Sequence, residues 1–373
     1  MDSSDSDQYD EDLFNAQDMD TDDEFDREVQ RRRRTTQDFD LLLLNLKPSV
    51  GRRGILAENF DLSKYTDYQC QRYFRFHTAQ DVEQLRGLLR MPDMMRTETG
   101  TVAPGLEVLC ITLRRLAYPC RYVDLGTMFR RSESALCQLF NLGLNHIYDN
   151  FSPKIIELNQ PWLTLPQLHM YCDVIADKGA ALQNCWGFID GTVRPICKPS
   201  EIQRELFNGH KRVHGIKFQS IVTPDGLIAN LFGPMSGRRH DAALLNASGL
   251  LDHMERHYNI NGQPLCIYGD PAYPQRPHLY RPFLGHNLTP QQQQFNTDMS
   301  SVRQAVEFGF GKVVENWAFL DYKKNLKLFL SPVGKLYHVG AILTNCLTCM
   351  YPAHGGLVNY FEIDPPSIDE YLQ

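Results

Sequence analysis

The chain has 373 residues, of which 42% are hydrophobic, enough to fill the core of one large or two modest domains. Its net charge of −7 is unevenly spread, because the first 40 residues hold 12 Asp and 3 Glu against five Arg and leave about +3 for the rest. The longest apolar runs fall far short of the ~20 residues that span a bilayer, and no secretory signal is present. We therefore expect no membrane contact, and a mildly basic folded part that is compatible with a polyanionic partner.

The N-terminal 50 residues are predicted to be a disordered acidic tail, because Asp, Ser and Gln dominate and little apolar surface is available. Four consecutive arginines at positions 31–34 match a nuclear-import patch, and a solvated charge run that balances the tail explains them equally well. With a reducing compartment indicated by ten irregularly spaced cysteines, we expect a nuclear protein.

Residues 51–165 are predicted to form an all-helical region. Leucines at positions 106, 109, 113 and 116 recur at helical spacing, and Tyr118-Pro119 ends that helix. A short helix at 122–129 and a longer one at 132–146, with Ser132 as its N-cap, are typical of a helix-turn-helix. Arg130 and Arg131 would stand at its corner, where they and Ser132 could contact DNA. Any three-helix bundle gives the same pattern, so simple packing stays an alternative.

Residues 166–354 are predicted to form a mixed α/β domain, and residues 355–373 a C-terminal tail. The apolar run 185–190 indicates a buried strand ending at Asp190, and the segments 217–223 and 227–232 indicate a hairpin. A helix at 242–254 has Asp241 at its start, a second strand at 265–270 ends in Asp270, and a helix at 300–317 carries Glu307 beside its apolar stripe. This order of elements is typical of a mixed sheet flanked by helices.

Carboxylates at the ends of two strands point to a metal site, because ligands of open α/β sheets usually bind at that edge. Asp190, Asp241, Asp270 and Glu307 would repel one another if they converged, unless cations lay between them. An all-oxygen set suits Mg²⁺ or Mn²⁺, and two such ions ~4 Å apart can promote cleavage of a phosphodiester bond. Taken singly, each acid is also explained as a turn former, a helix cap or an exposed helical residue.

Five ordered motifs resemble the PIF/Harbinger transposases and their domesticated relatives, a DDE nuclease family with an RNase H-like fold. They are Gly187-Phe-Ile-Asp190-Gly-Thr, Ser236-Gly-Arg-Arg-His240-Asp241, Gly269-Asp270-Pro-Ala-Tyr-Pro274, the Phe295-Asn296 that precedes Arg303-Gln-Ala-Val-Glu307-Phe-Gly-Phe310, and Leu343-Thr-Asn345. The intervals of 51, 29 and 37 residues between successive acids are of the kind that the family shows. The likeness continues weakly upstream to about Phe74.

The resemblance implies that Asp190, Asp270 and Glu307 are the catalytic metal ligands and that Asp241 is a further ligand. Glu307, and not Glu315, carries the Arg-x-x-Val-Glu context. It also implies a divalent cation, DNA as substrate, a helix-turn-helix within residues 122–146, and a Myb-like DNA-binding partner protein. One departure is that the basic helix face after the family's glutamate is largely lost here, where Lys312 is the remaining cation.

A second group of DNA-contact candidates lies ahead of the hairpin. Lys211 and Arg212, with His210 and His214, form the densest basic cluster of the α/β region and could touch phosphates, although a solvated loop explains them equally well. The leading hypothesis is a metal-dependent nuclease of the Harbinger-like type. The alternatives are a domesticated transposase that binds DNA or chromatin without cutting it, and a hydrolase of small phosphoesters.

Overall fold

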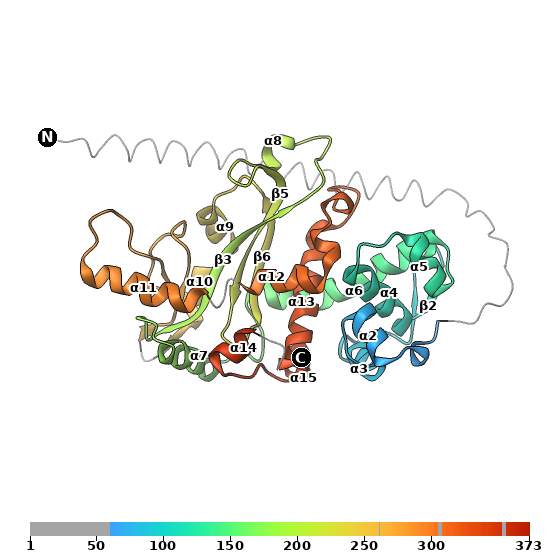
Figure 1. Ribbon diagram of the computed structural model, residues 1–373, viewed down its shortest axis with the longest axis horizontal. Coiled ribbons are helices and arrows are strands. Elements are labelled where there is room, and N and C mark those ends of the chain that lie inside the picture. Colours follow the sequence, from blue (N-terminus) through green and yellow to red (C-terminus); the bar gives the residue numbers. More distant parts are fainter. Residues whose placement is uncertain (1–59, 261, 305–307, 353–355) are drawn as a thin grey trace.

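The computed structural model describes residues 60–260, 262–304, 308–352 and 356–373 (Figure 1). The predicted disorder of residues 1–50 and the position of Glu307 therefore lie outside the described residues. A mainly helical region comes first and a mixed α/β unit follows. The prediction that residues 51–165 are all-helical is wrong in one place, because the short strands β1 and β2 pair antiparallel there. The helical region contains η1 (Leu62–Lys64), α2 (Asp67–Phe74), α3 (Ala79–Leu88), β1 (Met94–Arg96), β2 (Val102–Pro104), α4 (Gly105–Ala117), α5 (Tyr122–Phe129) and α6 (Glu133–Glu157).

The helical region is built around α4, which is almost entirely buried and confirms the helix predicted from the leucine spacing. Helices α2 and α3 each begin with a capping box, in which Thr66 and Thr78 accept a hydrogen bond from the third helical residue. Ser132 caps α6 as predicted, with its hydroxyl accepting from the amide of Ala135. Helix α6 runs well past the predicted end at 146, through Pro153, and ends at Leu158 in the left-handed conformation. The extension carries α6 onto the neighbouring sheet.

The α/β unit has a six-stranded mixed sheet with the order β10-β9-β3-β5-β4, in which β6 also pairs with β5. Strand β9 runs parallel to β3 and β10, whereas β5 is antiparallel to β3, β4 and β6. The strands are β3 (Cys185–Pro195), β4 (Phe207–Asn208), β5 (Val213–Val222), β6 (Ile228–Ser236), β9 (Cys266–Tyr268) and β10 (Leu279–Tyr280), with a separate pair β7 (Asn259–Ile260) and β8 (Gln263–Pro264).

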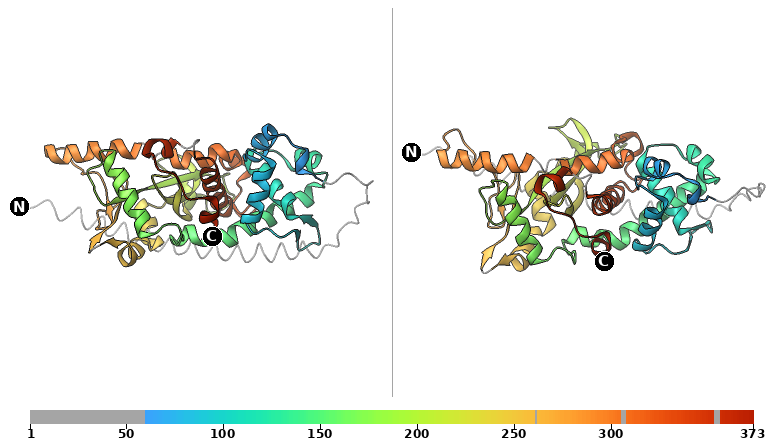
Figure 2. Two further views of the ribbon diagram at one scale, coloured as in Figure 1. Left: turned by 90° about the horizontal axis from the view of Figure 1, so that it is seen from below. Right: turned by 60° about the horizontal axis from the view of Figure 1, so that its bottom comes forward.

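Helices surround this sheet and contain most of the remaining sequence. They are α7 (Leu165–Asp177), α8 (Gln203–Leu206), α9 (Asp241–Ser248), α10 (Leu250–His257), α11 (Pro290–Gln304), α12 (Phe308–Asn316), η2 (Ala318–Asp321), η3 (Lys323–Asn325), α13 (Val333–Met350), α14 (Gly356–Phe361) and α15 (Ile368–Leu372). Helix α7 packs on β3, and α6 and α13 pack on β6 and on each other. In both views of Figure 2, α11 projects at the end of the molecule opposite α2 and α5.

The hairpin β5–β6 was predicted correctly, and a buried carboxylate shapes its turn. Asp225 accepts hydrogen bonds from the Thr223 hydroxyl at 2.5 Å, from the Leu227 amide at 3.2 Å and from the Tyr171 hydroxyl at 2.5 Å. Gly226 follows with φ +81°, a conformation that glycine adopts without steric cost. The turn is therefore fixed to α7 as well as to its own strands.

Three predicted boundaries differ from the structure. The helix predicted at 242–254 is two helices, α9 and α10, because Gly249 between them has φ +62°. The helix predicted to start at Ser300 starts at Pro290, since a polar glutamine run forms its first turns. The segment predicted to be a C-terminal tail forms α14 and α15, whose apolar side chains are buried.

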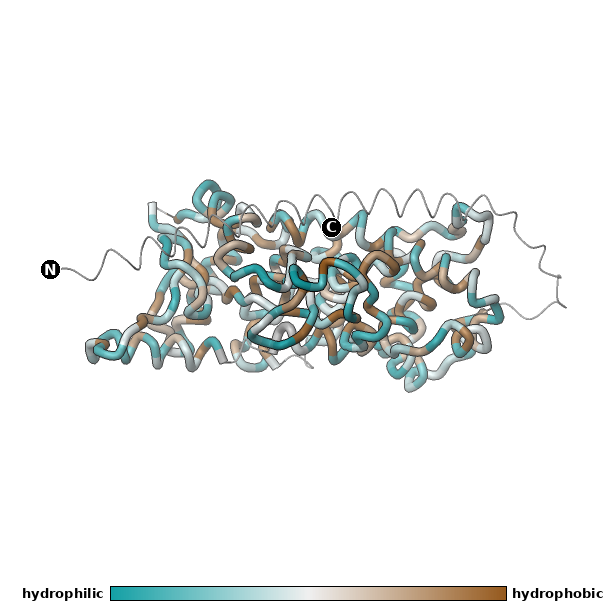
Figure 3. The backbone as a smooth tube through the Cα atoms, turned by 90° about the horizontal axis from the view of Figure 1, so that it is seen from above, coloured by the Kyte–Doolittle hydropathy of each residue, from teal (hydrophilic) through white to brown (hydrophobic). Residues whose placement is uncertain are grey.

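The C-terminal helices are anchored through the last family-like motif. The Asn345 side chain accepts from the Ile228 amide and donates to the Ile228 carbonyl, both at 2.9 Å, and it donates to the buried Tyr371 hydroxyl at 3.0 Å. Asn345 thus joins α13, β6 and α15. Loops at the periphery are largely hydrophilic (Figure 3), and among the described residues no helix combines the length and apolar character needed to cross a membrane.

Candidate active site

Asp190 lies inside β3, not at its end. The strand continues to Pro195, and Asp190 stands opposite Ser220 in the antiparallel ladder with β5. The predicted strand end at Asp190 is therefore wrong, and the physical reason is that β5 supplies hydrogen-bonding partners on one side over the whole length of β3. On the other side β9 ends at Tyr268, so the sheet is open there. Asp190 consequently stands at a step in the sheet.

Asp270 follows β9 at the corresponding height. The parallel register pairs Phe188 with Tyr268, and two further residues bring Asp190 level with Asp270. Neighbouring strands are ~4.8 Å apart, so the two carboxylates leave adjacent backbones. Asp270 is held in a turn, because its Oδ1 accepts from the Ala272 amide at 3.0 Å. The prediction that the two aspartates share one edge thus agrees with the register.

The charges of Asp241 and Asp270 affect the titration of their neighbours in the site. Partial burial raises the pKa of Asp190 to about 6, opposed by the Arg303 guanidinium and reinforced by the charges of Asp270 and Asp241. Burial also raises the pKa of Asp270, with the charge of Asp241 as the next cause. A cation bound between these carboxylates would offset the repulsion between their negative charges.

Asp241 reaches the site from the first turn of α9 and is paired with a buried cation. Its Oδ1 lies 2.9 Å from Nζ of Lys217, and the two side chains are 17% and 8% exposed. Lys217 comes from β5 and also donates to the Arg239 carbonyl at 3.0 Å. The carboxylate lies against Gly191, where a Cβ atom would be only 1.9 Å from Oδ1. Glycine is therefore required at 191 for Asp241 to approach β3.

A second cation comes from α11. Arg303 donates from Nη2 to Oδ1 of Asp190 at 3.4 Å, and the two side chains are 19% and 40% exposed. Arg303 is the first residue of the family-like motif that ends at Glu307. The motif therefore begins with a residue that contacts the first aspartate directly.

A buried hydroxyl faces the acidic cluster. Tyr273 is fully buried, and its hydroxyl has no hydrogen-bond partner among the described residues. Burial raises its pKa, and the charges of Asp241, Asp190 and Asp270 raise it further. An unpartnered buried hydroxyl is costly, and next to carboxylates it is suited to a site that takes up further polar groups.

The donor set fits a hard divalent cation. The groups brought together are carboxylate oxygens with a buried hydroxyl, and these suit Mg²⁺ or Mn²⁺. Among the residues that the structure describes, no three Asp, Glu, His or Cys side chains are arranged to hold a metal ion. Two of the aspartates instead pair with cations of the chain, Asp241 with Lys217 and Asp190 with Arg303.

The other predicted site residues lie elsewhere. Glu307 falls outside the described residues, between α11 and α12. Lys211 and Arg212 are exposed in the turn before β5, with Arg212 at φ 53° and the Lys211 amide donating to Asn208 Oδ1 at 2.8 Å. Neither of these two side chains is brought to the acidic cluster by a contact in the structure.

At the corner of the predicted helix-turn-helix, one arginine is committed to the fold. Arg131 donates to both oxygens of buried Glu107, at 2.5 and 2.8 Å, and to the Val102 carbonyl at 3.2 Å. Arg130 is exposed and adopts the left-handed conformation that ends α5, and Ser132 is exposed at the start of α6. Figure 1 shows this corner well away from β3.

Sequence reasoning did not assign roles to Lys217, Tyr273 or the Arg303 side chain. The signal for Lys217 was a lysine between the apolar residues Ile216 and Phe218 of a buried strand, where a lysine needs a partner. The sequence indicated Arg303 only as the first residue of the motif that ends at Glu307, with no role for its side chain. The lost basic face of α12 also has an explanation: Val313 and Trp317 are fully buried, with the Trp317 indole donating to Thr344 Oγ1 at 3.1 Å. Those two positions face the core.

The comparison with protein families identifies this part of the chain. Residues 189–345 match the model of the DDE superfamily endonuclease, a segment that runs from the residue before Asp190 to Asn345 and includes Asp241 and Asp270. No curated protein and no solved structure matches the chain. The chain therefore carries a DDE superfamily endonuclease domain across residues 189–345, which suggests a transposase-like nuclease that hydrolyses phosphodiester bonds.

Proposed function

We propose that the protein is a Harbinger-type DDE nuclease that cuts DNA with Mg²⁺ or Mn²⁺. The observation that carries the proposal is the parallel register of β3 and β9, which brings two half-buried carboxylates, Asp190 and Asp270, to neighbouring strands, where burial raises the pKa of both. Asp190, Asp270 and Glu307 would hold the metal, with Asp241 as a further ligand. Bound there, divalent cations would supply Lewis-acid activation of the attacking water and stabilise the leaving oxygen.

The chain's own residues would prepare this site for a polyanion. Lys217 holds Asp241 in place from β5, and Arg303 balances the charge of Asp190. Excess negative charge from the aspartates would otherwise repel a DNA phosphate. The proposal includes an RNase H-like fold for the catalytic unit, a helix-turn-helix at residues 122–146 with Arg130 and Ser132 exposed toward DNA, a nuclear location, and a Myb-like partner that recruits the target.

The test measures nicking of a supercoiled plasmid by the full chain with Mg²⁺, Mn²⁺ or EDTA. We expect Asp190→Asn, Asp270→Asn and Glu307→Gln each to reduce metal-dependent nicking at least ~10³-fold. Asp252→Asn, at an exposed position of α10, is the matched control and should leave the rate unchanged. Robust metal-dependent nicking by all three variants would refute the site.

Metal binding is measured separately, so that the result does not depend on a partner protein. Mn²⁺ titration followed by electron paramagnetic resonance should show binding to the wild type and a large loss in Asp190→Asn and Asp270→Asn. A wild type that binds no Mn²⁺ would favour the second candidate function, a domesticated transposase that holds DNA without cutting. One observation favours that candidate: Lys217 and Arg303 already neutralise two of the aspartates.

A further inference from the structure

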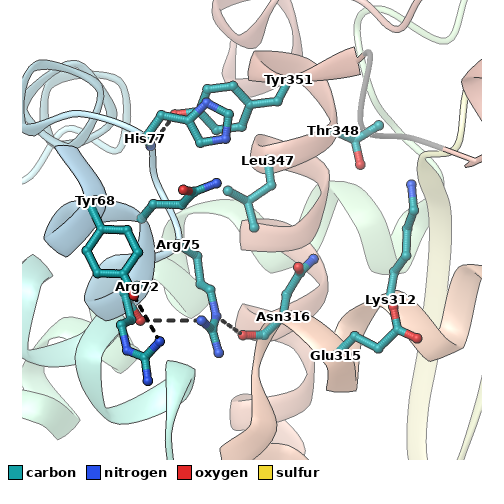
Figure 4. A pocket seen from close by; sticks show the side chains of 11 residues that line it. Tyr68, Arg72, Arg75, His77, Lys312, Glu315, Asn316, Leu347, Thr348 and Tyr351 are labelled. Carbon is teal, nitrogen blue, oxygen red and sulfur yellow. Dashed lines mark hydrogen bonds between the residues drawn. The ribbon is translucent and has the colours of Figure 1, made fainter.

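A pocket of about 590 Å³ lies away from the aspartates, between the helical region and the α/β unit (Figure 4). Arg72, Arg75 and His77 line it from α2 and the segment that follows, Lys312 and Asn316 line it from α12, and Tyr351 closes it after α13. Its volume falls in the range of ~300–1,000 Å³ that is usual for ligand sites.

One cation of the pocket is a fixed part of its wall. Arg75 donates from Nε to the Asn316 carbonyl at 2.9 Å, from Nη2 to the Ala117 carbonyl at 3.0 Å and from Nη1 to the Arg72 carbonyl at 3.3 Å. Burial lowers its pKa, and the charges of Arg114 and Arg72 lower it further, so three arginines lie close together. Arg75 thus joins α2 to α12 and adds positive potential without offering a free donor set.

The other two cations of the pocket, Arg72 and Lys312, make few contacts with the described residues. The Arg72 guanidinium makes one hydrogen bond among the described residues, to the exposed Tyr68 hydroxyl at 3.3 Å. Lys312 rises from α12 toward Thr348 (Figure 4) and forms no ion pair within the described part of the chain. Burial lowers the pKa of Lys312, and the charge of Glu315 acts in the opposite direction without overcoming it. A half-buried ammonium that forms no ion pair with the described residues, with only the exposed Glu315 carboxylate acting on it, can still attract an incoming anion.

The opposite wall is aromatic and rigid. The rings of His77 and Tyr351 stack at 3.7 Å between centroids with planes 19° apart. The Tyr351 hydroxyl accepts from the His77 amide at 2.9 Å and donates to Asp81 at 2.8 Å, so two hydrogen bonds hold that hydroxyl in place. A flat aromatic wall facing arginine and lysine donors matches a ligand that combines phosphate with a planar or sugar moiety.

We infer that this pocket binds a phosphate group, carried either by a free nucleotide or by the DNA backbone, with Arg72 and Lys312 as its direct ligands. The occupant would touch α2 on one side and α12 on the other and would strengthen the contact that Arg75 already makes between them. The inference does not depend on metal binding at the aspartates.

The experiment titrates the full chain with ATP, with inorganic pyrophosphate and with a fluorescent 20-base-pair duplex, all in EDTA so that the aspartates hold no cation. Wild type is compared with Arg72→Gln, Lys312→Gln and the double variant. We expect each single variant to weaken binding of whichever probe occupies the pocket by about tenfold, which is the loss in affinity expected when one charged hydrogen bond is removed. Lys198→Gln, at an exposed lysine that does not line the pocket, is the matched control and should change nothing.

The two sources give different patterns. Loss of ATP and pyrophosphate affinity with duplex affinity retained assigns the pocket to a free nucleotide, and loss of duplex affinity assigns it to the DNA backbone. The inference is overturned if the double variant binds every probe as the wild type does, if no probe binds, or if Lys198→Gln weakens binding equally. Thermal melting of each variant without ligand shows whether it is folded.

Discussion

The Lys217 ammonium lies 2.9 Å from Asp241 Oδ1, and neither side chain is more than 17% exposed. The aspartate cluster therefore contains an internal cation on β5. Lys217→Met would leave the Asp241 charge without its partner, and we expect a loss of about 3–5 kcal/mol in the free energy of unfolding, measured with urea. The double variant Lys217→Met/Asp241→Asn should recover much of that loss.

The matched control for Lys217 is Lys178→Met, which breaks an ion pair with Glu362 whose carboxylate side chain is 78% exposed. We expect it to cost less than about 1 kcal/mol. Additive effects of the Lys217 and Asp241 substitutions in a double-mutant cycle would contradict the coupling.

Gly191→Ala should impair the site without unfolding the protein. The added methyl group would be 1.9 Å from Asp241 Oδ1, so the carboxylate must move away from β3. A displaced site group costs ~10²-fold in rate, and we expect metal-dependent nicking to fall by about that factor. Gly209→Ala, where a Cβ atom meets nothing within 4 Å, is the control. Equal rates for the two variants would count against the role of Asp241.

Glu307 and Glu315 should differ sharply although eight residues separate them. Glu315 is exposed on α12 and lines the pocket of Figure 4, whereas Glu307 ends the motif that begins at Arg303. We expect Glu315→Gln to leave Mn²⁺ binding within ~2-fold of the wild type, whereas Glu307→Gln should weaken it far more and reduce plasmid nicking at least ~10³-fold. The reverse order would reassign the third acid.

His338 should make the fold less stable in acid. It is fully buried between Tyr148 and Phe218, and burial lowers its pKa below the ordinary value. The unfolded chain therefore binds a proton at His338 near pH 6.5 while the folded chain does not, so stability falls as the pH drops below that value, by up to ~1.4 kcal/mol per pH unit. Denaturant unfolding between pH 7.5 and 5.5 should show a smaller pH slope for His338→Gln. Equal slopes would contradict the assignment.

Much of the fold could be predicted because local patterns agreed with the tertiary structure. The leucine spacing gave α4, Ser132 gave the start of α6, and Pro224-Asp225-Gly226 gave the β5–β6 turn. Boundaries failed where a distant partner decided them. Strand β3 extends past Asp190 because β5 lies beside it, and α6 continues through Pro153 because it packs on β6 and α13. Neither partner is visible from the local sequence.

In the candidate site, too, some residues could be predicted from the local sequence and others could not. Asp190 and Asp270 were predictable, since each follows an apolar run and precedes or follows a glycine. Their cations were not, because Lys217 lies on an antiparallel neighbour and Arg303 on a helix far along the chain. The DNA-contact role of Arg130 and Lys211 remains a prediction, and Arg131 is engaged with Glu107.

The backbone of Asp190 lies within the sheet, whereas that of Asp270 lies in a turn after β9, so we expect different hydrogen exchange at the two positions. Asp190 is held in the ladder with β5, so amide protons around it exchange with solvent only when the centre of the sheet opens. Asp270 lies beyond the end of β9 in a turn closed by its own carboxylate, and amides there exchange through small local openings. Hydrogen exchange at residues 270–273 therefore reports ligand binding directly, while exchange at 190 reports the stability of the whole domain.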